Sequence, residues 1–292
     1  MYKTGKRKSA FTLIEIMVAT VVMVVLTGLV IQITSEVLKV WNRSSGKLTT
    51  NAQARIAMDL LTQDLEAAVF RNNNMTWLES EQEKLVGPFG GNSTFKTTYL
   101  KLFSPALDRP SAAGDICGIS YILKYSDPIT GLDTGDQRER TFILYRNIID
   151  PETTFKDLMG DGNQELLNKS LWNDVNTIDS GRNFLASNIV DFRVDFYVED
   201  DGITSTQTLV SAYSNKTVYG GDSATVGPQS TNGILKKPLA YAEITLTVIS
   251  DQALQVIQNG AWAQTGFENN EDYILANSEV YTRRVNFLAR PL

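Results

Sequence analysis

The sequence predicts an α+β protein in which a long N-terminal helix packs on an antiparallel β-sheet head. Two observations predict this fold. An apolar run near the N-terminus continues into sequence with helical periodicity, and the remainder contains short stretches in which apolar and polar residues alternate. With 292 residues, 42% of them hydrophobic and 21% charged, the chain is long enough to bury a substantial core.

A short basic leader precedes an apolar segment that is long enough to span a membrane. Residues 11–33 contain one charged residue, Glu15, and a bilayer core of about 30 Å needs about 20 helical residues. Because basic residues precede the apolar run, we expect a single-pass protein with a cytoplasmic N-terminus. We divide the chain into a leader at 1–10, a transmembrane half-helix at 11–34, an amphipathic half-helix at 35–72 and a globular head at 73–292.

The amphipathic half-helix is predicted from the spacing of its apolar residues. Ile56, Leu60 and Leu65 recur at helical intervals, with charged residues between them. We expect these three residues to form the face that docks on partner helices. No proline occurs before Pro88, so the helix is expected to continue to about residue 71.

Alternating sequence in the head predicts β-strands that are separated by polar loops. The segment between residues 125 and 141 is rich in Gly and Asp, which is typical of a hairpin loop, and a short helix is expected at residues 251–257. The strand at 281–288 is expected to pair with the strand at 240–249. The predicted strands are 99–103, 119–125, 141–146, 190–198, 240–249 and 281–288.

The junction between leader and apolar run carries the most specific motif. The segment SAFTLIE, residues 9–15, resembles the processing site of type IV prepilins and type II secretion pseudopilins. The resemblance implies cleavage by a prepilin peptidase between Ala10 and Phe11, followed by N-methylation of Phe11. Ala10 stands where the family usually has Gly. The resemblance further implies that Glu15 serves assembly, because a carboxylate in an apolar span can pair with the new amine of a neighbouring subunit.

A second resemblance concerns the role within a filament. Residues 60–71, LLTQDLEAAVFR, are similar to the end of the long helix in J-type minor pseudopilins, the large-headed tip subunits of type II secretion. The order of the later strand motifs is similar too. The resemblance implies a structural subunit at the tip of, or priming, a type IV pilus-like or type II secretion filament. Its partners would be the prepilin peptidase and other minor pilins or pseudopilins, with the head periplasmic or extracellular and the helix in the inner membrane.

Composition argues against several other classes of function. The net charge of −6 disfavours a nucleic-acid-binding surface, and the absence of histidine removes His-dependent catalytic triads and the usual zinc sites. We therefore expect no enzymatic activity. Two alternatives stay open: a binding or adhesin head that uses the polar stretch at 204–231, and a carboxylate-based hydrolase that uses Asp195, Glu199 or Glu243.

One loop has the composition of a weak calcium site. Oxygen-bearing side chains surround a Gly turn in the segment DLMGDGNQE, which suits a hard cation. The candidate ligands are Asp157, Asp161, Asn163 and Glu165. We expect no other cofactor.

Overall fold

The computed structural model describes most of the helix and the strands of the head. The described residues are 12–69, 76–88, 96–106, 113–131, 140–159, 166, 169–172, 183–198, 209–210, 216–220 and 239–287. The chain divides into two compact units, Met1–Gly46 and Lys47–Leu292.

A single helix, α1 (Leu13–Glu66), forms the N-terminal part of the chain. At 1.5 Å per residue it is about 80 Å long. It ends at Glu66 rather than near residue 71, because the next residues bond elsewhere: the Val69 N–H donates to the carbonyl of Phe103 at 2.8 Å. The backbone therefore leaves the helix to join the edge of the head.

The face of α1 that packs on the head is narrower and richer in small residues than expected. Leu65 is fully buried in the head's own core, so the prediction that it docks on partner helices is wrong. Ile56 is 56% exposed and Leu60 is half-buried, and their partner contacts stay predictions. The buried apolar residues of this helical face are Ala54, Ala57, Met58, Leu61, Leu65 and Ala68.

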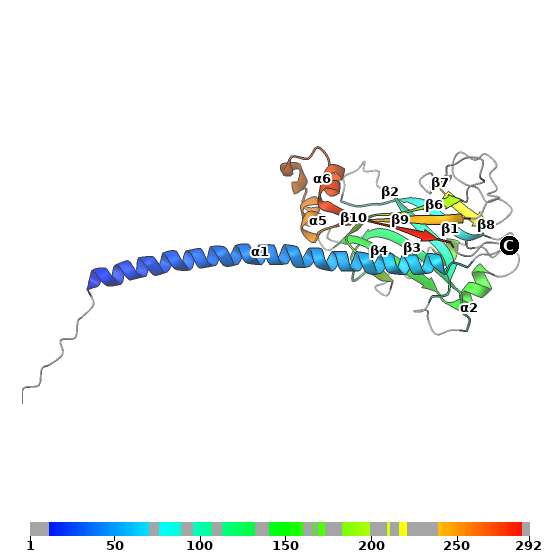
Figure 1. Ribbon diagram of the computed structural model, residues 1–292, viewed down its shortest axis with the longest axis horizontal. Coiled ribbons are helices and arrows are strands. Elements are labelled where there is room, and N and C mark those ends of the chain that lie inside the picture. The colour runs from blue at the N-terminus through cyan, green and yellow to red at the C-terminus, as the bar shows by residue number, and fades with distance from the viewer. Residues whose placement is uncertain are drawn as a thin grey trace, which may run out of the picture. The chain divides into compact units, whose positions relative to one another are not determined.

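The head contains two antiparallel sheets in the described part of the chain (Figure 1). The first has the order β5-β4-β3-β2-β1-β8 and the second the order β10-β9-β6-β7. The predicted α+β class is confirmed, as is the pairing of the last two predicted strands. The strands are β1 (Thr76–Lys84), β2 (Lys96–Ser104), β3 (Cys117–Ser126), β4 (Thr141–Ile149), β5 (Phe184–Ser187), β6 (Ile189–Val198), β7 (Leu209–Val210), β8 (Lys216–Gly220), β9 (Leu239–Ile249) and β10 (Ser278–Asn286).

Short helical segments connect the strands. Two of them, α5 and α6, lie together beyond the ends of β9 and β10 (Figure 1). The predicted helix at 251–257 corresponds to α5, whereas α6 was not expected. The segments are α2 (Pro151–Thr153), the π-helix η1 (Thr154–Leu158), α3 (Lys169–Trp172), α5 (Asp251–Gln258), the 3₁₀-helix η2 (Ala261–Thr265) and α6 (Asn270–Asn277).

Asn188 turns the chain from one sheet into the other. It is the single residue between β5 and β6, and its φ of 61° lies in the left-handed region, which Asn tolerates better than most residues. Its side-chain oxygen accepts from the Thr141 hydroxyl at 2.7 Å, and its carbonyl accepts from the Ile249 N–H at 2.9 Å. These bonds hold the corner where both sheets begin to share a core.

Strand β1 contains seven polar residues in nine, and sequence alternation did not reveal it. Glu79 lies opposite Lys101 of β2, and the two side chains form a buried ion pair at 2.8 Å. Lys101 also lies 4.2 Å from the centre of the Tyr99 ring, a favourable position for a cation. The buried Glu79 carboxylate of this strand is thus neutralised within the sheet.

A buried ionic cluster links α1 to the first sheet. Arg146 of β4 donates to Asp64 of α1 through Nε at 2.8 Å and through a terminal nitrogen at 3.1 Å. Tyr121 of β3 donates its hydroxyl to the same carboxylate. All three residues are at least 94% buried, and burial together with Asp64 raises the pKa of Tyr121, so the phenol keeps its proton. The cluster fixes the rotation and height of this half of α1 on the sheet.

Two further ion pairs, both more exposed to solvent than the buried cluster, connect the same half of α1 to β10. Lys47 pairs with Glu279 at 2.5 Å, and Asp59 pairs with Arg283 at 2.5 Å. Because the earlier helix residue meets the earlier strand residue, this half of α1 and β10 run in the same direction. The start of β10 therefore lies at the end of the head where Lys47 enters.

We predict that Asp64→Ala strongly destabilises the head, whereas Asp59→Ala does not. Removing Asp64 leaves the Arg146 cation buried without its carboxylate, which costs about 3–5 kcal/mol, while an exposed pair contributes about 1 kcal/mol or less. Urea unfolding of the fragment Lys47–Leu292, followed by circular dichroism, measures both. Equal destabilisation by the two variants would contradict the role assigned to the buried cluster.

Candidate functional site

The start of α1 is built by a reciprocal pair of hydrogen bonds between Thr12 and Glu15. Glu15 Oε2 accepts from the Thr12 N–H at 2.8 Å and from the Thr12 hydroxyl at 2.9 Å. In return, Thr12 Oγ1 accepts from the Glu15 N–H at 3.4 Å. This is the capping box, which satisfies backbone donors that a helix start otherwise leaves unpaired.

The capping box places the Glu15 carboxylate at the very start of an apolar helix. All of these bonds to its side chain use Oε2, and the residue is exposed. A carboxylate at a helix N-terminus is stabilised by the helix dipole, yet in a hydrocarbon surrounding it also requires a cationic partner. Ala10 and Phe11, the predicted processing residues, lie outside the described residues.

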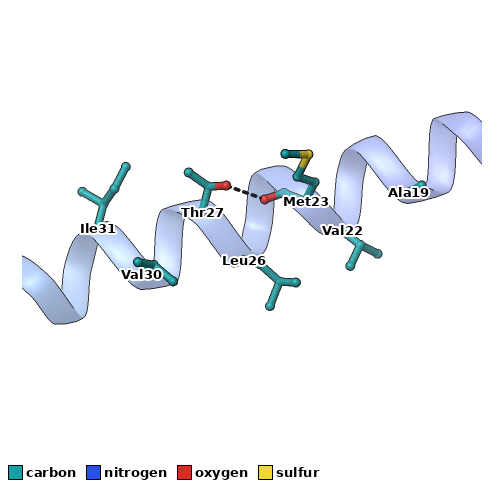
Figure 2. A pocket seen from close by; sticks show the side chains of 7 residues that line it. All are labelled: Ala19, Val22, Met23, Leu26, Thr27, Val30 and Ile31. Carbon is teal, nitrogen blue, oxygen red and sulfur yellow. Dashed lines mark hydrogen bonds between the residues drawn. The ribbon is translucent and has the colours of Figure 1, made fainter.

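The apolar segment after Glu15 has the length and composition of a membrane span. By these criteria α1 is the one such helix in the described residues, and none of its most apolar window is buried by the protein. Hydroxyls within it are satisfied by the helix itself: Thr27 donates to the carbonyl of Met23 at 2.8 Å (Figure 2). One continuous apolar surface is thus offered to lipid or to other helices. Figure 2 shows Ala19, Val22, Met23, Leu26, Thr27, Val30 and Ile31 on it.

The neck, which we define as residues 34–46, has two different sides. Helical spacing places Glu36 and Lys39 on one side, and Val37 and Trp41 on the other. Val37 and Trp41 are 60% and 69% exposed. Lipid would favour apolar residues all round, so this pattern suits a helix with a protein partner on one side and water on the other.

Two acids of the hydrolase alternative are neighbours on the second sheet. Asp195 of β6 lies directly opposite Glu243 of β9, a relation that only the strand register reveals. Arg193 Nε donates to Asp195 at 2.6 Å, and the Tyr197 hydroxyl donates to Glu243 at 3.4 Å. Glu199, the third candidate, lies outside the described residues.

Asp191 is the acid of this face with the strongest perturbation. Burial raises its pKa to about 6, partly opposed by the Arg193 cation. A protonated acid can serve as a proton donor, but Asp191 precedes Asp195 by four strand residues, a separation of roughly 13 Å. Paired carboxylates of glycoside hydrolases are about 5–9.5 Å apart. Asp191 and Asp195 therefore do not form such a pair.

The candidate calcium ligands fall mostly outside the described residues. Asp157, in η1, is half-buried, whereas Asp161, Asn163 and Glu165 are not described. Within the described ranges no group of three acidic or cysteine side chains is arranged to hold a metal ion. The calcium site stays a prediction.

Comparison with known proteins supports the N-terminal motif. Residues 5–31 match the model of the family described as "Prokaryotic N-terminal methylation motif". No curated protein and no solved structure matches the chain. The matched segment covers residues 5–10 of the leader, the capping box and most of the apolar span. The chain thus carries a type IV prepilin-like signal, followed by a pilin-like α+β architecture with a membrane-anchoring helix.

We predict that the mature protein begins at Phe11 and carries an N-terminal methyl group. A prepilin peptidase that recognises the matched segment would remove ten residues. Intact-mass spectrometry of the protein from membranes measures the loss and the added methyl group. A chain that still begins at Met1 beside an active prepilin peptidase would overturn this expectation.

We also predict that Asp191→Asn stabilises the protein at pH 8 but not at pH 4. The folded pKa of about 6 exceeds the unfolded value of 3.8, so the folded state binds this proton more tightly. Ionisation of Asp191 therefore costs the folded state almost no stability near pH 4. The cost grows as the pH rises to 6, and above pH 6 it reaches up to about 3 kcal/mol. Thermal unfolding at both pH values measures the effect. Asp195→Asn, which removes the negative charge that pairs with Arg193, is the control and should destabilise at pH 8.

Proposed function

We propose that this chain is a minor prepilin-like subunit, of the J-type, that primes or caps a type IV pilus-like or type II secretion filament. The observation that carries this proposal is the capped acid: Glu15 stands at the start of a membrane-length helix, inside the segment that matches the methylation motif. In this role the protein is structural and catalyses no reaction.

Assembly follows from the charges that processing would leave. Cleavage before Phe11 creates a positive amine four residues ahead of Glu15, and both charges then lie in an apolar surrounding. An amine of one subunit paired with Glu15 of the next neutralises two buried charges, and an unpaired charge is strongly unfavourable. Four helical residues correspond to about 6 Å, so this pairing would also set the axial step between neighbouring helices.

The neck supports the same proposal independently. Val37 and Trp41 are exposed beyond the membrane span, and the opposite side carries Glu36 and Lys39. In a bundle of prepilin-like helices, the apolar side would be covered by partner helices and the charged side would meet water. The partners are thus the prepilin peptidase during processing and other minor pilins or pseudopilins during assembly.

A tip position fits the size of the head. The residues after α1 number over two hundred, for which compact-domain scaling gives a radius of gyration of roughly 17 Å. A head of this size strains lateral packing around a narrow shaft but is unconstrained at the end of a filament. Quantitative mass spectrometry of purified filaments tests this position. A few copies per filament are expected, and hundreds of copies along the shaft would contradict the tip position alone.

The membrane orientation follows from the leader. Basic residues before the apolar run favour a cytoplasmic N-terminus in the inner membrane, which leaves the head periplasmic or extracellular.

The two alternative functions, an adhesin head and a hydrolase, carry less support. The adhesin surface at 204–231 falls mostly outside the described residues, with only 209–210 and 216–220 described, and in the hydrolase alternative Asp195 is already bonded to Arg193.

We predict that Glu15→Gln abolishes assembly without affecting membrane insertion. Glutamine at this position still completes a capping box, so the helix start is preserved while the charge is lost. The variant should be processed and resident in the membrane, yet its co-purification with partner subunits should fall by about tenfold or more. Immunoprecipitation after detergent extraction measures this.

The matched control is Thr12→Ala, which removes the hydroxyl of the capping box and keeps the carboxylate. It should assemble nearly normally if Glu15 acts between subunits. If Thr12→Ala fails to assemble while Glu15→Gln succeeds, then Glu15 acts only as a helix cap and the pairing is wrong.

A further inference from the structure

The N-cap of α1 lies directly after the bond that processing is expected to cut. Thr12 is the first described residue, and α1 begins at Leu13. Within the described residues, the first helical backbone bond runs from the Ile16 N–H to the Thr12 carbonyl, at 3.3 Å. Thr12 is therefore the N-cap residue, because its carbonyl accepts the first helical bond while the residue itself precedes the helix. A helix capped at this position begins after the bond between residues 10 and 11.

The bonds of the Thr12 cap oppose an earlier helix start. Its N–H and its hydroxyl both donate to Glu15 Oε2, and its hydroxyl oxygen accepts from the Glu15 N–H. These reciprocal bonds hold Thr12 as a cap. A helix that began earlier would have to break them, because Thr12 would then lie inside the helix and its N–H would need another acceptor.

The sequence offers a second N-cap three residues earlier. Ser9 is a residue type preferred at this position, and its side chain could accept from the Thr12 N–H. A helix capped by Ser9 would begin at Ala10 and would include the bond between Ala10 and Phe11. The two caps therefore compete. Capping at Thr12 leaves this bond outside the helix, and capping at Ser9 places it inside.

No helix breaker near the bond decides this competition. Residues 6–11 contain neither Gly nor Pro, and Ala10 has the highest helix propensity of any residue type. Position 12 differs from position 9 in one respect. Glu15 follows Thr12 by three residues and completes a capping box, whereas the residue three positions after Ser9 is Thr12, which cannot. The capping box is thus the feature that favours the later start.

The position of the helix start matters to a peptidase because a helix protects its own backbone. Inside a helix, the N–H and C=O groups of a peptide bond are engaged in helical hydrogen bonds. When the backbone opens and closes faster than it is cut, the rate of cleavage follows the population of the open form. A shift of the helix start from Leu13 to Ala10 would therefore slow cleavage before Phe11.

We propose that the capping box of Thr12 and Glu15 is a processing determinant, which ends α1 before the bond between Ala10 and Phe11 and keeps that bond open to the prepilin peptidase. This inference rests on the proposed function, which supplies the peptidase. Thr12 is then a positioning residue of the substrate. Glu15 acts twice, first within its own chain as part of the cap and later between subunits.

Cleavage kinetics of the uncut full chain test the proposal. The chain is purified in detergent micelles from cells that lack the peptidase, purified prepilin peptidase is added, and loss of ten residues is followed by mass spectrometry. Thr12→Ala removes the capping hydroxyl and raises helix propensity, so it should be cleaved at least about threefold more slowly. Thr12→Ser restores a capping hydroxyl and should be cleaved at about the unmodified rate. Slower cleavage still runs to completion, so Thr12→Ala can assemble.

The matched control is Thr20→Ala. The Thr20 hydroxyl donates to the Met17 carbonyl at 2.8 Å inside the helix. The substitution therefore deletes the same group and raises helix propensity in the same way, but leaves the helix start intact. Its rate of cleavage should stay within about 1.5-fold of the unmodified rate. Equal slowing by Thr12→Ala and Thr20→Ala would show that the cap is not the cause.

A second substitution separates helix extension from direct recognition of Thr12. Ser9→Ala removes the competing cap, and Ala10→Gly lowers helix propensity at the bond. When either is combined with Thr12→Ala, the rate should return to within about twofold of the corresponding single variant, Ser9→Ala or Ala10→Gly. If neither restores the rate, the peptidase reads the Thr12 hydroxyl itself and the proposal is wrong.

The helix start can also be measured without the peptidase. In the uncut chain, the ¹³Cα chemical shift of Ala10 reports whether this residue is helical. The shift should be non-helical in the unmodified chain and should move toward the helical value in Thr12→Ala. An unchanged shift would contradict the competition between the two caps.

The same assay distinguishes this inference from the proposed function. If an active prepilin peptidase does not cut the unmodified chain before Phe11, the processing step of the proposed function is wrong, and this inference falls with it. If the unmodified chain is cut there and Thr12→Ala is cut equally fast, only the role assigned to the capping box is wrong.

Discussion

The buried contact between Asp64 and Arg146 is the constraint on which the head depends. Each charge would be unfavourable alone in the core, and the Tyr121 hydroxyl supplies a further donor to the carboxylate. A helix that packs only through alanines, Met58 and leucines could slide along a sheet or rotate on it with little loss of packing energy. A buried ion pair removes that freedom, because any slip separates the charges. The position of the Lys47–Glu66 part of α1 on the sheet is therefore set by a polar contact inside an apolar interface.

Local periodicity explains which parts of the fold could be predicted from sequence. Strands β3, β4, β6, β9 and β10 alternate or are continuously apolar, and their pairing follows from short loops or chain order. Strand β1 was not predicted, because the charge of its buried Glu79 is neutralised by Lys101 on another strand, which no local pattern reveals. The packing face of α1 was misplaced for a similar reason. Small alanines mark it, and larger residues such as Ile56 stand on the exposed side.

The candidate site shows the same division between local and distant information. Thr12 and Glu15 are three residues apart, so their spacing fits a capping box, but we expected only an assembly role for Glu15 and none for Thr12. Asp195 and Glu243 are 48 positions apart, and only the register of β6 on β9 makes them neighbours.

Processing would change the electrostatics of the helix start in a way that makes assembly favourable. The capping box uses Thr12 and Glu15, both of which remain after cleavage before Phe11. The new amine, however, adds a positive charge beside the helix end that already carries the positive pole of the dipole. The helix start then needs more negative charge than its own cap provides. A carboxylate of an adjoining helix supplies it without exposing either charge to hydrocarbon. The uncut chain has no such amine next to Thr12, so its helix start does not need this additional negative charge. In the proposed filament, cleavage would thereby convert a capped, self-sufficient helix start into one that is stabilised by a neighbour.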